Sequence, residues 1–359
     1  MKIVEVIADS SLSGAPKHLL TLISGINKKN FSITLICPKG WLSKKAKQLK
    51  IETINIKMAG FSDFSSVSKI KKEILKIKPD IVHLHGIRAG WLGAMALGGQ
   101  NKKIIYTEHL YNQNYHLQSR LRQILQINGL SYILKKTEII ITPSLAVKNF
   151  LCQKFKIPKN KVIIVANGLK DIKISKHIEK EKIGFIGSLN HQKGVEYLIK
   201  SFKTVIKKFP NIKLEIIGDG PLRKILEKKA NKISKNIIFL GAKNNIWKYL
   251  SNWKMLIIPS RSEAFGQTAV EAAILHKPVV ASDIVGLNEV IRNNITGLLF
   301  KEGNTQSLAK KIIYLLKNPK IAKKMGKKGR KRFEKLYNSE IMVNKIERIY
   351  FQHAKQYCK

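Results

Sequence analysis

The segment from Pro259 to Ala273, PSRSEAFGQTAVEAA, combines two carboxylates with residues that suit the start of a helix. Glu263 and Glu271 flank seven residues that include Gly266 and several small side chains. Backbone amides in the first turn of a helix can face an anion or sugar hydroxyls. A carboxylate is a natural acceptor for two neighbouring hydroxyls. Two glutamates at this spacing alone would favour ordinary surface residues, so the assignment depends on the rest of the chain.

Two earlier segments also join a strand to a helix through a glycine-bearing turn. In GSLNHQKGVEYLIKSF, from Gly187 to Phe202, Lys193 stands beside Gly194 just before a helix. An ammonium at such a turn can neutralise a diphosphate, although in a lysine-rich chain a single lysine usually faces solvent. The other segment, IIGDGPLR from Ile216 to Arg223, is a weak motif by itself, and no G-x-G-x-x-G dinucleotide fingerprint occurs.

Three histidines follow or occupy predicted strands. His83 and His85 are two positions apart, so they point to the same face of a strand and raise the question of a metal site. We expect none, because no third and fourth ligands stand nearby in the sequence. His109 ends the next strand, where a hydrogen-bonded histidine is common.

The formal charge of +44 invites a nucleic-acid or anionic-membrane interpretation. Only nine of the 67 basic residues are Arg, the residue suited to bidentate phosphate and base recognition. The basic residues are spread over both halves of the chain. This pattern favours a solvated basic surface and leaves contact with anionic lipid or a charged saccharide open.

The three cysteines, Cys37, Cys152 and Cys358, are far apart and form no C-x-x-C pair, which indicates a reducing compartment. The N-terminus MKIVEVIADS is typical of a first strand and not of a signal peptide. No apolar run approaches the roughly 20 residues needed to span a bilayer. We therefore expect a cytoplasmic protein, with peripheral contact at the inner face of the cell membrane as an open alternative.

Short β-rich runs alternate with lysine-bearing helical segments, the pattern of parallel sheets covered by helices. The first series of strands is expected at Ile3–Ala8, Ile33–Cys37, Ile81–Leu84, Lys103–Thr107, Ile139–Thr142 and Val162–Val165, and the second at Ile183–Ile186, Lys213–Ile217, Ile237–Leu240, Met255–Pro259, Val279–Ala281 and Gly297–Phe300. With 359 residues, two domains are the default. The polar run from Leu169 to Glu181 is expected to link them, and the chain is helical after Asn304.

Taken in order, these segments resemble the large retaining glycosyltransferase family 4, also called glycosyl transferases group 1. The resemblance covers nearly the whole chain and rests on the ordered set of motifs. Besides the three segments above, it includes LSGAPKHLLTLI, PDIVHLHG, IIYTEHL, TPSLAVKNFL, VANG, KNIIFLGA and HKPVVASDIVGLNEVI with TGLLF. It implies the GT-B fold: two facing Rossmann-like domains with parallel sheets, residues 1–170 on the acceptor side and 171–338 on the nucleotide-sugar side, with a C-terminal helix over 339–359 returning to the first domain.

The resemblance also implies roles for side chains. Glu271 would bind the ribose hydroxyls, and Glu263 would contact the donor sugar near its reacting side. Lys193 would contact the diphosphate, while His109 would reach the donor sugar. We therefore expect Glu263, Lys193 and His109 to take part in catalysis.

The remaining contacts to the donor would come mostly from turns. The resemblance assigns the sugar and diphosphate to backbone amides of Phe265, Gly266, Gln267 and Thr268, with the Gly14 loop approaching from the first domain. This chain has Ser188 where many family members have Arg, so one diphosphate cation is missing, and Arg261 could replace it. The first loop reads Gly14-Ala15 where a Gly-Gly pair is common.

The expected activity is transfer of a hexose from a nucleotide-sugar, UDP- or GDP-linked, to a saccharide or lipid-linked saccharide with retention of configuration. The donor is a substrate, and neither a cofactor nor a metal is expected. Two alternatives stay open. A sugar-nucleotide epimerase of the same fold would act on the donor without an acceptor, and a nucleic-acid or polyanion-binding protein would show steeply salt-dependent binding without turnover.

Overall fold

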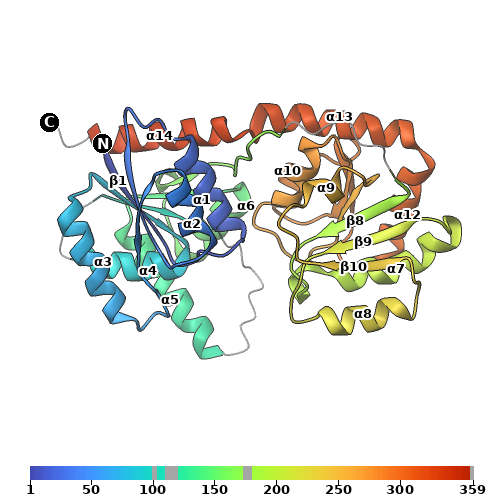
Figure 1. Ribbon diagram of the computed structural model, residues 1–359, viewed down its shortest axis with the longest axis horizontal. Helices are drawn as coiled ribbons and strands as arrows, with labels where there is room; N and C mark the ends of the chain where they lie inside the picture. The colour runs from blue at the N-terminus through green and yellow to red at the C-terminus, as the bar shows by residue number, and fades with distance from the viewer. Residues whose placement is uncertain (99–102, 110–119, 173–179, 356–359) are drawn as a thin grey trace. The chain divides into compact units, whose positions relative to one another are not determined.

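The computed structural model describes residues 1–98, 103–109, 120–172 and 180–355. The chain forms two compact units. Unit 1 contains Met1–Lys170 and Asn338–Lys359, and unit 2 contains Asp171–Tyr337 (Figure 1). Most of the linker expected at 169–181 lies outside the described residues, as does Cys358. Each unit is a Rossmann-like α/β domain, which confirms the fold class expected from the sequence.

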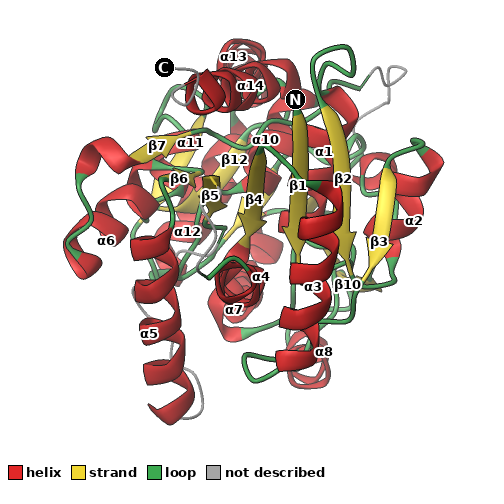
Figure 2. Ribbon diagram, turned by 90° about the vertical axis from the view of Figure 1, so that its left-hand side faces the viewer, coloured by secondary structure: helices red, strands yellow, loops and turns green. Residues whose placement is uncertain are grey.

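Unit 1 is built on a seven-stranded sheet in the order β3-β2-β1-β4-β5-β6-β7 (Figure 2). Its strands, all paired in parallel, are β1 (Lys2–Ile7), β2 (Ser32–Cys37), β3 (Glu52–Asn55), β4 (Ile81–His85), β5 (Lys103–Thr107), β6 (Ile139–Thr142) and β7 (Val162–Ile164). The central strands β4 and β5 are buried along their whole length. Such continuous burial is the property of a parallel sheet with helices on both faces.

Two groups of helices cover this sheet. The helices are α1 (Gly14–Gly25), α2 (Trp41–Gln48), α3 (Phe64–Ile77), α4 (Gly86–Ala96), α5 (Arg120–Lys136), α6 (Leu145–Phe155) and α14 (Ser339–Lys355), with a 3-10 turn η1 (Lys159–Lys161). Helix α1 packs against α2 and α14, whereas α4 packs against α3 and α5. Each group buries an apolar stripe against the strands.

The final helix α14 belongs to unit 1, as the family resemblance implied. Its inward face places Met342, Val343, Ile346 and Tyr350 in the same apolar core as β1 and α1. Gly25 at the end of α1 permits this contact, because a Cβ atom there would lie 2.9 Å from Val343 Cγ2. The core of unit 1 is therefore completed by the end of the chain.

Unit 2 repeats the arrangement with a six-stranded parallel sheet in the order β10-β9-β8-β11-β12-β13. Its strands are β8 (Lys182–Ile186), β9 (Lys213–Ile217), β10 (Ile237–Gly241), β11 (Leu256–Ile258), β12 (Val279–Ser282) and β13 (Gly297–Phe300). Its helices are α7 (Val195–Lys208), α8 (Arg223–Asn231), α9 (Trp247–Leu250), α10 (Gln267–Ile274), α11 (Leu287–Val290), α12 (Thr305–Lys317) and α13 (Pro319–Leu336), with a 3-10 turn η2 (His191–Lys193). A buried Trp253 packs on Gly184 and donates a hydrogen bond to Glu215 Oε2 at 2.7 Å.

All twelve strands expected from the sequence are present, and one strand was missed. Strand β3, ETIN, is only half-buried and has one apolar residue among three polar ones, so it lacks the apolar run of the central strands. None of the helices in the described part of the chain has the length and apolar content needed to cross a lipid bilayer.

Candidate functional site

Both sheets reverse their strand order beside the first strand of the unit. In unit 1 the chain moves from β1 outward to β3 and then crosses to β4, and in unit 2 it moves from β8 outward to β10 and then crosses to β11. Ligands of open α/β sheets bind at such switch points, beyond the carboxyl ends of the strands. Most candidate residues of each unit lie on or after the strands on the two sides of its switch point, and His109 follows β5, the next strand of the sheet.

In unit 2 the turn after β8 is held against the turn after β11. Gly194 has a φ of +59° and packs so closely that a Cβ atom would lie 2.1 Å from the Pro259 carbonyl oxygen. The Arg261 amide donates to the Gln192 carbonyl at 2.8 Å, and the Gln192 side chain donates to the Ser262 carbonyl at 3.2 Å. These contacts bring together two segments that are about seventy residues apart in the sequence.

The result is a lysine beside a glutamate. Lys193 Nζ lies 2.6 Å from Glu263 Oε1, which also accepts a hydrogen bond from the Ser260 hydroxyl at 2.9 Å. The Lys193 side chain is 23% exposed and that of Glu263 is 12% exposed, so both are restrained but still open to a ligand. An ammonium and a carboxylate held at one strand end can bind an anionic group and a hydroxyl next to each other.

Helix α10 begins immediately after this pair. Gly266 has a φ of +87°, and a Cβ atom there would lie 2.7 Å from Leu287 Cδ2, so glycine is required to turn the chain into the helix. The Phe265 ring is buried and makes an edge contact with Tyr337. The residues expected to offer backbone amides therefore surround the first turn of α10, with Gln267 and Thr268 as its first two residues and both only partly buried.

Glu271 lies further along the same helix and is 4% exposed. Glu271 is therefore carried by the helix that begins directly after the Lys193–Glu263 pair. Burial of a carboxylate is costly unless polar groups pair with it, which marks Glu271 as more than a surface residue.

Ser188, where a diphosphate cation is missing, and Arg261, its possible replacement, differ in their surroundings. Ser188 is exposed in the turn after β8. The Arg261 guanidinium forms an ion pair with Glu196, donates to the Tyr197 hydroxyl at 3.0 Å and lies over the Tyr197 ring. Because Glu196 already neutralises it, Arg261 offers a diphosphate less charge than the sequence suggested.

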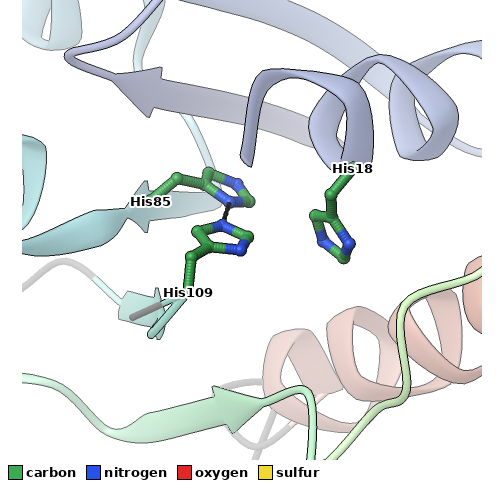
Figure 3. Close-up of side chains that lie close together, drawn as sticks. All are labelled: His18, His85 and His109. Atoms are coloured by element: carbon green, nitrogen blue, oxygen red, sulfur yellow. Dashed lines mark hydrogen bonds between the residues drawn. The ribbon is translucent and has the colours of Figure 1, made fainter. Parts of the chain in front are cut away.

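In unit 1 the switch point is lined by histidines. Figure 3 shows His18 from α1, His85 from the end of β4 and His109 from the segment after β5 with their rings facing one another. His85 Nδ1 and His109 Nε2 are 3.2 Å apart, and the ring centres of His18 and His109 are 5.0 Å apart. Gly14, the other residue expected here, is the first residue of α1.

A buried carboxylate from β1 joins this group. Glu5 stands opposite His83 in the parallel register of β1 and β4. Its Oε2 lies 2.7 Å from His85 Nε2, and its Oε1 accepts a hydrogen bond from the Tyr350 hydroxyl at 2.8 Å. We expected no third and fourth ligands near His83 and His85 from the sequence around them, but in space the register of the sheet supplies a third ligand-type side chain from a distant strand.

Two three-residue groups here have ligand atoms close enough to hold a metal ion: His18 with His85 and His109, and Glu5 with His83 and His85. In the second group each ligand atom already has a hydrogen-bonding neighbour, since His83 Nδ1 lies 2.6 Å from the Tyr350 hydroxyl and His83 Nε2 lies 2.7 Å from Thr107 Oγ1. These contacts fit a hydrogen-bonded network. Absence of a metal remains a prediction.

The electrostatics of this network follow from its burial. Burial alone would raise the pKa of the Glu5 carboxyl, but His83 and His85 outweigh it and hold that pKa well below its usual range. Burial lowers the pKa of His18 to about 3 and that of His85 to about 4, and it holds the pKa of His109 well below its ordinary value. At neutral pH the site therefore contains the ionised Glu5 carboxylate and neutral imidazoles at His18, His85 and His109.

Sequence reasoning did not single out Glu5, His18 or Tyr350. Glu5 could have been found, because it is the one charged residue inside the apolar run IVEVI of a predicted buried strand. Tyr350 could not, since its contact depends on where the last helix packs.

Comparison with known proteins places both units in one enzyme class. The model for Glycosyltransferase Family 4 matches residues 12–171, and that for Glycosyl transferases group 1 matches residues 169–332. A capsular polysaccharide biosynthesis glycosyltransferase of Staphylococcus aureus is 25% identical over 93% of both chains, and an uncharacterised glycosyltransferase of Methanocaldococcus jannaschii is 30% identical over 82% of both. The crystal structure of HepE from Anabaena with UDP and glucose has a TM-score of 0.86, with 17% identity over 98% of this chain and 100% of that one.

Proposed function

Because this chain belongs to the family 4 glycosyltransferases, we propose that it transfers a hexose from a UDP- or GDP-sugar to a saccharide or lipid-linked saccharide, with retention of configuration. The observation that carries the proposal is the Lys193–Glu263 pair, 2.6 Å apart at the switch point of unit 2 and directly before helix α10. A fixed cation and a carboxylate at this position suit a diphosphate joined to a sugar.

Unit 2 would hold the donor. Glu271 binds the ribose hydroxyls, while the amides around Gly266 and Thr268 face the diphosphate and sugar, where a helix N-terminus favours negative charge. The structural similarity to HepE, crystallised with UDP and glucose, supports UDP as the first nucleotide to test. The similarity to a capsular polysaccharide glycosyltransferase supports a saccharide acceptor.

Catalysis would depend on stabilising the leaving diphosphate. Negative charge grows on the bridging oxygen as the glycosidic bond breaks, and Lys193 with the α10 amides would stabilise it there. The departing phosphate oxygen then accepts the proton of the acceptor hydroxyl on the same face of the sugar. Glu263 fixes Lys193 and the sugar in place, and His109 of unit 1 contacts the donor sugar. No metal, cofactor or protein nucleophile takes part.

A thermal-shift screen with UDP-, GDP- and ADP-sugars tests donor binding. A specific donor at 100 times its dissociation constant should add about 2.7 kcal/mol of stability. Product analysis then separates the enzyme classes, because a transferase releases a nucleotide only with an acceptor present, whereas an epimerase converts the donor alone. No stabilisation by any nucleotide-sugar, together with salt-dependent binding to nucleic acid, would favour the polyanion-binding alternative.

A membrane-bound acceptor would suit the basic surface. Helix α13 exposes seven lysines and one glutamate. Each lysine near an anionic bilayer contributes about 1 kcal/mol of attraction. Cosedimentation with phosphatidylserine vesicles, but not with phosphatidylcholine vesicles, is the expected result, and equal binding to both would exclude an electrostatic contact.

A further inference from the structure

A single chain of hydrogen bonds connects the carboxylate of Glu5 to His109. Glu5 is fully buried, and its carboxylate lies among His83, His85 and Tyr350, with His83 Nδ1 at 3.3 Å from the same Oε2 that His85 Nε2 contacts at 2.7 Å. His85 then continues the chain to His109 at 3.2 Å. Glu5 is therefore connected to His109 through His85.

The direction of each hydrogen bond follows from the chemistry of Glu5. An ionised carboxylate can only accept, so His85 must carry its proton on Nε2. A neutral His85 then has a bare Nδ1, which can only accept the hydrogen bond from His109 Nε2–H. This leaves Nδ1 of a neutral His109 without a proton. The low pKa values of Glu5, His85 and His109 agree with these protonation states.

We propose that Glu5 is a positioning residue that, through His85, fixes His109 as the tautomer with a proton on Nε2 and a bare Nδ1, so that His109 accepts a hydrogen bond from a hydroxyl of the donor sugar. The proposal rests on the proposed function for the identity of the ligand. It does not rest on that function for the tautomers, which are a property of the protein alone.

The neighbouring His18 indicates which kind of group enters the site. Asn167 lies beside the His18 ring, yet among the described residues neither ring nitrogen of His18 has a hydrogen bond of good geometry, although the side chain is buried. A neutral imidazole offers one donor and one acceptor, and a hydroxyl can pair with either. A sugar hydroxyl between His18 and His109 would satisfy a buried polar ring that otherwise costs free energy.

Nitrogen-15 NMR of histidine-labelled protein without substrate tests the tautomers directly, because protonated and bare ring nitrogens resonate far apart. Single His→Gln variants assign the signals. In the parent protein, His85 and His109 should each show a protonated Nε2 and a bare Nδ1. A proton on His109 Nδ1 would overturn the proposal, and so would stoichiometric zinc bound by these nitrogens in the purified protein.

The variant Glu5→Leu removes both acceptor oxygens, so neither tautomer of His85 and His109 is favoured. Their nitrogen signals should therefore move to positions between those of protonated and bare nitrogens. Glu5→Gln retains one carbonyl acceptor and should keep part of the parent pattern, which also provides a readout if the leucine variant fails to fold. Glu215→Leu is the matched control, because Glu215 is likewise buried in a parallel strand but lies in unit 2. Parent tautomers in a folded Glu5→Leu would show that Glu5 does not set them.

Steady-state kinetics test whether the tautomer of His109 affects turnover. Glu5→Leu should lower kcat about 10- to 100-fold, by analogy with the loss of a group that orients a metal-binding histidine. Glu215→Leu should stay within about threefold of the parent, and Glu5→Gln should fall between them. Equal loss in Glu5→Leu and Glu215→Leu would indicate a merely structural role. If the parent transfers no sugar at all, the proposed function fails while the NMR result still decides the role of Glu5.

Discussion

Replacing Lys193 by alanine tests the diphosphate site most directly. The substitution removes the ammonium that lies 2.6 Å from Glu263 and leaves that carboxylate, 12% exposed, with the Ser260 hydroxyl. Two effects follow. The protein loses stability because a half-buried charge loses its partner, and catalysis loses a cation where negative charge develops.

The two effects have different magnitudes. Leaving a partly buried carboxylate without its ion-pair partner should lower the free energy of unfolding by about 1 to 3 kcal/mol. Removing one group that stabilises developing negative charge typically lowers turnover about 100- to 1,000-fold. Since Ser188 supplies no charge and Arg261 is paired with Glu196, we expect a loss near or above the lower figure.

A matched ion pair in the same unit separates stability from catalysis. Lys182 pairs with Glu215, with side chains 26% and 6% exposed, close to the values for Lys193 and Glu263. Lys182→Ala should therefore cost similar stability, measured by urea unfolding, yet leave kcat within about threefold of the parent. Lys193→Arg should recover part of the lost turnover, because it restores the charge with a different geometry.

Steady-state kinetics with an identified donor and acceptor decide the outcome, once circular dichroism has shown that each variant is folded. A kcat for Lys193→Ala within about threefold of the parent would refute the reasoning. Lys193 would then be one more solvated lysine, and the diphosphate site would have to be sought elsewhere.

Three further outcomes are expected. Glu271→Ala should weaken donor binding about 5- to 150-fold in calorimetry, since hydroxyls lose a buried acceptor at a cost of about 1 to 3 kcal/mol; unchanged affinity would remove Glu271 from the site. Activity should be complete in excess EDTA, because fixed protein groups stabilise the diphosphate, and strict dependence on Mg²⁺ or Mn²⁺ would contradict this. His18 and His85 stay neutral in the folded protein down to about pH 3 and about pH 4, whereas the unfolded chain protonates them below about pH 6.5. Stability should therefore fall with acidification below that pH, by about 1.4 kcal/mol per pH unit for each histidine, and a free energy of unfolding in urea that is the same at pH 7.5 and 5.5 would contradict it.

The fold could be predicted well from the sequence because parallel strands buried on both faces are continuous apolar runs, as in III of β6 or LII of β11. The half-buried edge strand β3 lacks such a run and was missed for that reason. The start of helix α10 was equally predictable, because Gly266 suits the positive φ at the residue before the helix.

The site was only partly predictable, because contacts between distant residues depend on register and packing. The sequence indicated His83 and His85 on one face, and the structure adds Glu5, which the parallel register places opposite His83 and which contacts His85. Arg261 was a reasonable second cation from its position beside Glu263, but its partner Glu196 lies on another helix and could not be foreseen. The roles of the candidate residues themselves stay predictions.

The position of Tyr350 has a consequence for synthesis of the chain on the ribosome. The N-terminal sheet is complete before unit 2 is made, yet its buried Glu5 lacks one hydrogen-bond donor, and its apolar face lacks part of its cover, until α14 has left the exit tunnel. Unit 2, whose residues 171–337 are continuous, can fold before unit 1 is finished. The nascent N-terminal unit would therefore expose apolar surface throughout synthesis of unit 2, a window in which chaperone binding would protect it.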